Sequence, residues 1–94
     1  MPPDPLAELT RLQEQEERAV ESMEEHRRQL ATLQALLEDA KRRGDTAAVG
    51  IEARVRTEEE GVARAEREIA ALREQIVAAE KALPPNLKDD DEEA

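Results

Sequence analysis

Apolar residues recur every seven positions along two stretches of the chain, one on each side of Gly44. In a heptad lettered abcdefg, apolar residues at positions a and d form the seam along which coiled-coil helices pack. In the first stretch, position a holds Leu9, Glu16, Met23, Leu30 and Leu37, and position d holds Leu12, Ala19, His26, Leu33 and Ala40. In the second stretch, position a holds Ala48, Val55, Val62, Ile69, Ile76 and Leu83, and position d holds Ile51, Glu58, Ala65, Leu72 and Ala79. The pattern continues for about five heptads on each side, which predicts two long helices.

The residues around Gly44 are typical of a reversal between two helices. Basic residues at 41–43 suit a helix end, glycine adopts the left-handed conformation that often follows one, and Asp45 or Thr46 can cap the next helix. When position a of one helix faces position d of the other, the facing residues are spaced symmetrically about residue 44. Both signals predict an all-α fold, an antiparallel two-helix coiled-coil hairpin. The alternative, a parallel dimer with one helix continuing through residue 44, is disfavoured by Gly44 and Gly50.

Capping residues and prolines set the expected ends of the hairpin. Asp4 can accept a hydrogen bond as an N-cap, and Pro5 is tolerated at the first helical position. A proline disfavours helical backbone in the residue before it, so Pro84 ends the second helix. We therefore expect a capping segment over 1–4, helices over about 5–43 and 46–83, a turn over about 44–46, and a disordered acidic tail over 84–94.

Three layers of the predicted seam pair a polar residue with an apolar one. These layers are Glu16 with Leu72, His26 with Val62, and Leu30 with Glu58. Gly61 lies close to the last two layers, and a glycine inside a helix costs about 1 kcal/mol relative to alanine. We therefore expect residues 26–30 and 58–62 to be the loosest part of the rod.

Further apolar residues lie outside the seam. A line at heptad spacing on the second helix consists of Val49, Ala63, Ala70 and Val77, and is interrupted at Arg56. A single pair of helices buries little apolar area, and the chain has no cysteine for a disulfide. We therefore expect the hairpin to self-associate into a four-helix bundle or to dock on a helical partner protein, with this line as the contact.

The composition narrows the classes of function. The formal net charge of −10 disfavours direct binding to nucleic acid and to anionic membranes. No apolar run is long enough for a transmembrane helix, and no signal peptide is visible. The leading hypothesis is a non-enzymatic cytoplasmic scaffold or adaptor that acts through protein–protein interaction.

The alternative hypothesis is an acidic inhibitor or regulator, for example a phage-encoded one, that binds a basic groove of a partner; this includes mimicry of nucleic acid. Its contact residues would be Glu58, Glu59, Glu60, Asp89, Asp90, Asp91, Glu92 and Glu93. Salt separates the two hypotheses, because capture by charge weakens as ionic strength rises and apolar docking does not.

Motifs with specific chemistry have plainer interpretations in this chain. Arg43-Gly44-Asp45 matches an integrin-binding tripeptide, but each residue also serves the predicted turn. Ser22 and His26 are four residues apart on one helix, yet a rod offers no oxyanion hole for acyl transfer. His26 could sense pH, since protonation would charge a seam layer. A single histidine and no Glu-x-x-His pair predict no metal site, and we expect no cofactor and no catalytic residue.

The hairpin resembles two groups of known proteins in outline. Small ESX-secreted hairpin proteins are similar in length, but their turn contains Trp-x-Gly where this chain has Arg42-Arg43-Gly44. Transcript-cleavage factors insert a hairpin with an acidic tip into RNA polymerase, whereas residues 41–43 make this tip basic. The sequence therefore assigns the chain to neither family.

Overall fold

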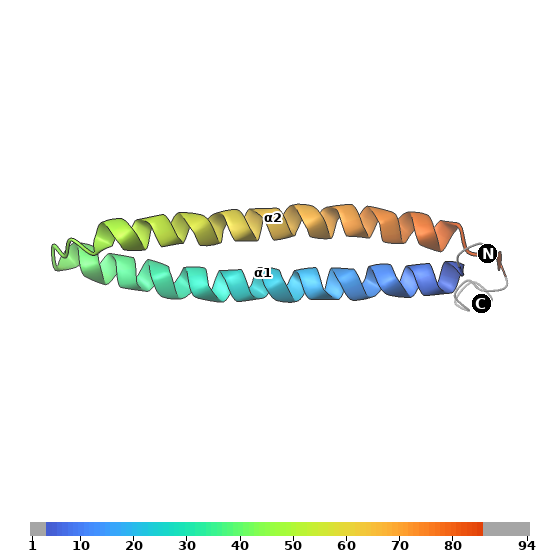
Figure 1. Cartoon of the computed structure of the whole chain (residues 1–94), viewed down its shortest axis with the longest axis horizontal. Helices are drawn as coiled ribbons and strands as arrows, with labels where there is room; N and C mark the ends of the chain where they lie inside the picture. Colours follow the sequence, from blue (N-terminus) through green and yellow to red (C-terminus); the bar gives the residue numbers. More distant parts are fainter. Residues whose placement is uncertain (1–3, 86–94) are drawn as a thin grey trace, which may run out of the picture.

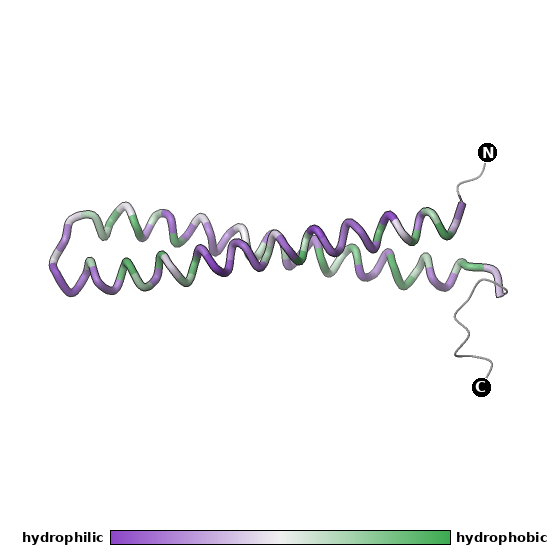
Figure 2. Tube along the Cα trace, turned by 90° about the horizontal axis from the view of Figure 1, so that it is seen from below, coloured by the Kyte–Doolittle hydropathy of each residue, from purple (hydrophilic) through white to green (hydrophobic). Residues whose placement is uncertain are grey.

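The protein is a helical hairpin in the shape of a rod. The computed structural model describes residues 4–85, in which helix α1 (Pro5–Arg42) and helix α2 (Ala48–Lys81) lie side by side and antiparallel along their whole length (Figure 1). The long axis of the molecule measures 65 Å. In the perpendicular view of Figure 2 the two helices cross near the middle of the rod. Hydrophobic and hydrophilic residues alternate along the length of both helices. The predicted all-α antiparallel hairpin is confirmed.

The seam follows the predicted heptads. Every buried apolar side chain occupies a predicted a or d position: Leu12, Ala19, Leu33, Ala40, Val55, Ala65, Ile69, Leu72 and Leu83. The main core cluster lies in the half of the rod nearer the chain ends, around Leu12, Ala19, Ile69 and Leu72. In α1 the a residues are only half-buried, whereas all d residues except His26 are buried. The helix is therefore rotated so that its a residues face one flank of the seam.

The turn at Gly44 has the predicted geometry. Gly44 has a φ angle of +65°, the left-handed region that favours glycine. The Asp45 N–H donates to the Ala40 carbonyl at 2.9 Å, and the Gly44 N–H donates to the Lys41 carbonyl at 3.1 Å. This pair of hydrogen bonds is the Schellman motif, which satisfies carbonyl groups left open at the end of α1.

The N-cap of α1 is also confirmed. The Leu6 N–H donates to the Asp4 carboxylate at 3.0 Å, and Pro5 takes the first helical position. Of the segments expected at the chain ends, residues 1–3 and 86–94 lie outside the described residues.

Helix α2 is shorter than predicted at both ends. It begins at Ala48 rather than residue 46, because the Asp45 carboxylate accepts from the Ala47 N–H at 2.9 Å and closes a turn before the helix. The helix ends at Lys81 rather than residue 83, because the Leu83 N–H bonds to the Glu80 carbonyl at 3.2 Å in a tighter final turn. Leu83 remains buried in the seam despite leaving the helix.

Candidate functional site

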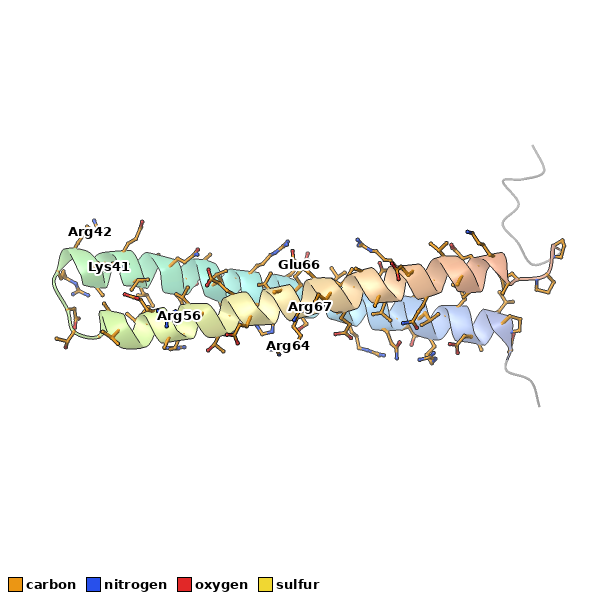
Figure 3. All side chains as sticks on the ribbon, turned by 90° about the horizontal axis from the view of Figure 1, so that it is seen from above. Lys41, Arg42, Arg56, Arg64, Glu66 and Arg67 are labelled. Atoms are coloured by element: carbon orange, nitrogen blue, oxygen red, sulfur yellow. The ribbon has the colours of Figure 1, made fainter. Side chains whose placement is uncertain are left out.

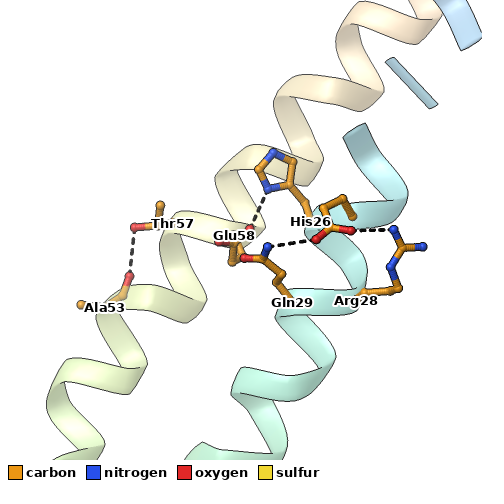
Figure 4. Close-up of polar contacts among 7 residues, drawn as sticks. His26, Arg28, Gln29, Ala53, Thr57 and Glu58 are labelled. Atoms are coloured by element: carbon orange, nitrogen blue, oxygen red, sulfur yellow. Dashed lines mark hydrogen bonds and ion pairs between the residues drawn. The ribbon is translucent and has the colours of Figure 1, made fainter. Parts of the chain in front are cut away.

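A polar pair occupies the middle of the apolar seam. His26 on α1 points across to Glu58 on α2, and its Nδ1 atom lies 2.6 Å from Glu58 Oε1 (Figure 4). The Glu58 side chain is 17% exposed and that of His26 is 36% exposed. In the predicted heptads these residues belong to two different layers. Their side chains are long enough to meet diagonally, which joins the two polar positions in one contact.

Gly61 provides the room for this pair. The residue is buried, and a Cβ atom built on it would lie 2.8 Å from both Cε1 and Nδ1 of His26. No side chain other than hydrogen fits there while the imidazole holds this position. This segment was predicted to be the loosest part of the rod. The structure instead shows a specific contact between the helices there.

Ser22 takes no part in this contact. Its side chain is exposed, and among the described residues no hydrogen bond joins it to His26. The carboxylate beside His26 Nδ1 comes from Glu58, a partner that the sequence alone did not predict.

The predicted apolar line on α2 divides into exposed and half-covered residues. Val49 is 76% exposed and Val77 is 48% exposed. Ala70 is exposed beside a groove between the helices, and Ala63 is half-buried. Val49 and Val77, near opposite ends of the helix, are therefore the large apolar side chains that this line offers to a partner.

The predicted acidic residues also divide. Glu59 and Glu60 are exposed, but Glu58 turns into the seam and bonds to His26. Glu58 therefore does not belong to a solvated acidic face. The other predicted contacts, Asp89, Asp90, Asp91, Glu92 and Glu93, lie outside the described residues.

Ion pairs between the helices occupy one flank of the seam. They are Arg27 with Glu66 at 3.0 Å, Lys41 with Glu52 at 4.0 Å, and Arg73 with Glu16 at 2.6 Å. Charged side chains also project along the outside of the whole rod (Figure 3). Pairs this exposed contribute little stability, about 0–1 kcal/mol each.

The opposite flank holds a groove that sequence reasoning missed. We call it the Leu36 groove; it has a volume of about 410 Å³ and is lined by Arg28, Gln29, Thr32, Leu33, Leu36 and Arg54. Leu33 is buried beneath it, and Leu36 is 50% exposed at its side. Arg54 makes no ion pair with any described residue. Leu36 directly precedes the seam residue Leu37 in the sequence, and this extra apolar residue beside the seam is the sequence signal for the groove.

Two surface carboxylates have perturbed pKa values. The Glu8 pKa is lowered by its hydrogen bond with Arg11. The Glu25 pKa is lowered by hydrogen bonds from Arg28 and Gln29, drawn in Figure 4. Both clusters lie within one helix and are exposed to solvent, so they support the helix locally.

Within residues 4–85, no group of three or more His, Asp or Glu side chains is placed to hold a metal ion. Neither α1 nor α2 combines the length and the hydropathy needed to cross a membrane. Comparison of the chain with known protein families, curated proteins and solved structures finds no match.

Proposed function

We propose that this protein is a non-enzymatic scaffold or adaptor in which a helical rod presents its outer faces to a protein partner. The observation that carries the proposal is the exposure of large aliphatic side chains that the seam does not use. Val49, Val77, Leu36 and Leu6 are all exposed. Helix faces with spaced apolar anchors are a common mode of docking between proteins.

The surface area supports the same proposal. The chain exposes 7082 Å². A compact monomer of the same mass, 10.5 kDa, exposes about 5,400 Å². A stable protein–protein interface takes about 800 Å² from each partner. The rod can therefore cover one complete interface and still expose as much surface as a compact protein. As a scaffold it would act in the cytoplasm, the location that we also propose.

Site-specific photo-crosslinking tests the proposal. A photoreactive residue is placed at Val49 or at Val77, and a control is placed at Thr57, an exposed polar position on the same helix. We expect crosslinks to one defined protein from positions 49 or 77, and none from position 57. Equal labelling of many proteins from all three positions would contradict a docking surface.

An acidic inhibitor of a basic groove remains the second candidate. Its support is the exposure of Glu59 and Glu60 together with the net charge of −10. The change of both residues to glutamine should then weaken capture of the basic partner at low salt, and salt should weaken capture by the unchanged protein. Crosslinks from Val49 or Val77 that persist at high salt favour the scaffold.

A further inference from the structure

The Leu36 groove combines an apolar base with two cationic groups. Leu33 is buried below, Leu36 is half exposed, and the guanidinium groups of Arg28 and Arg54 come from different helices. Arg28 contacts Glu25 at 2.6 Å on the solvent side, while Arg54 makes no ion pair with any described residue. Arginine binds carboxylates with paired hydrogen bonds. The groove therefore suits a short segment that has one aliphatic side chain followed by several carboxylates.

The chain itself contains a segment with that chemistry. Leu87 is followed, after Lys88, by five consecutive acidic residues: Asp89, Asp90, Asp91, Glu92 and Glu93. The segment therefore has an aliphatic side chain for the apolar base of the groove and carboxylates for its two arginines.

Leu87 of this segment cannot reach the apolar part of the groove in its own chain. Arg54 lies about 40 Å from Lys81 along α2, at about 1.5 Å per residue. Leu87 comes two residues after Pro85, so a fully extended chain places it at most about 7 Å further on. Even Glu93 extends no more than about 28 Å from Pro85. Of the two sources, only another copy can place Leu87 against Leu33 and Leu36.

An antiparallel arrangement of two rods brings the segment and the groove together. Arg54 is about 9 Å from the start of α2, so the groove lies near the Gly44 end of the rod. The segment leaves from the opposite end, after Pro85 (Figure 1). When two rods lie antiparallel, the segment of each copy emerges beside the groove of the other. The exchange is reciprocal, which closes the assembly at two copies.

We propose that the protein forms a two-fold symmetric dimer in which the Leu36 groove of each copy binds residues 87–93 of the other. This inference deepens the proposed function, since it names a second copy as one protein that the rod contacts. It uses a different face from the line that contains Val49 and Val77.

Charge reversal in the full chain tests the dimer. The groove variant is R28E/R54E, and the tail variant is D89K/D90K/D91K. Either change places like charges at both contacts of the homodimer, so each variant alone should be monomeric by light scattering. In an equal mixture, the native tail of one chain meets the native groove of the other, and the reversed tail meets the reversed groove. We therefore expect the mixture to form a heterodimer.

A matched control changes the same charge elsewhere. Arg64 and Arg67 are exposed on α2 and do not line the groove, so R64E/R67E should remain dimeric. The dimer dissociation constant should rise at least about tenfold for each reversed contact, since about 1.4 kcal/mol corresponds to a factor of ten. Helix content measured by circular dichroism shows that each variant folds, and recovery of the heterodimer shows it independently.

Three results would overturn the proposal. They are a monomeric unchanged protein across the micromolar range, a dimer that survives both reversals, and a mixture of folded variants that stays monomeric. None of these results affects the crosslinking from Val49 and Val77, so failure of the dimer and failure of the scaffold are distinguishable.

Discussion

The imidazole of His26 lies against the backbone of Gly61, so closely that a Cβ atom at residue 61 would stand 2.8 Å from Nδ1. Alanine at that position must displace the ring and with it the contact to Glu58. We expect Gly61→Ala to lower the free energy of unfolding by about 1–2 kcal/mol, although alanine favours helix by about 1 kcal/mol. Urea denaturation measures the change.

Gly50 provides the control for this prediction. It also lies in α2, but a Cβ atom there would meet nothing within 4 Å. Gly50→Ala should therefore stabilise the protein by up to about 1 kcal/mol. In the background His26→Ala, Gly61→Ala should become stabilising as well. If Gly61→Ala stabilises the unchanged protein, the contact with His26 does not restrict this position.

The His26–Glu58 pair should matter more when it is broken than when it is replaced. His26→Ala leaves the largely buried Glu58 carboxylate without its partner, and we expect a loss of about 1–2 kcal/mol. The double change to leucine, H26L/E58L, removes both polar groups and should be neutral or stabilising. If the double variant loses as much unfolding free energy as H26L and E58L lose together, the two side chains are not coupled.

Gly44 should tolerate asparagine better than alanine. Its φ angle of +65° strains any side chain with a Cβ atom, although the space around it is open. We expect Gly44→Ala to destabilise the hairpin by about 1 kcal/mol and Gly44→Asn by less, because asparagine enters the left-handed region more readily. Thermal unfolding compares the two variants. Equal stability of all three proteins would show that the turn rearranges.

Glu25 should titrate at a pH below that of an ordinary glutamate. Hydrogen bonds from Arg28 and Gln29 favour its ionised form and lower its pKa. A carboxyl pKa that is lower in the folded protein contributes stability above the ordinary pKa of the unfolded chain. That contribution is lost as the pH falls through the lowered value.

Arg28→Ala should therefore raise the Glu25 pKa toward its ordinary value. It should also weaken the dependence of unfolding free energy on pH in the acidic range. Carbon-detected nuclear magnetic resonance follows the carboxyl group directly. The titration of Glu8, which pairs with Arg11 in another turn of the helix, should stay unchanged.

Most of the fold could be predicted because it depends on local rules. The nine buried apolar residues all lie at heptad positions that the sequence displays. The Asp4 cap and the left-handed Gly44 follow from single residue types. The predicted start of α2 was wrong by two residues, because the Asp45 carboxylate accepts from the Ala47 N–H in a turn before the helix and no side chain caps α2.

The candidate sites were harder to predict because they depend on side chains that meet between the helices. Glu58 was predicted to face Leu30 in the seam or to contact a basic partner, but its carboxylate reaches His26. That contact needs the length of both side chains and the missing Cβ atom of Gly61, which heptad letters do not encode. The Leu36 groove likewise depends on how far Leu36 and Arg54 project from two different helices.

The turn at Gly44 also determines how such a protein can change its length. Each layer of the seam joins one residue before the turn to one after it. Seven residues added to α1 alone would leave a heptad without a counterpart, and every layer beyond the insertion would change partners. Growth or shortening that preserves the pairing must therefore occur in both helices, in matching heptads at equal distances from Gly44. The length of the rod is therefore specified twice in the chain, once by each helix.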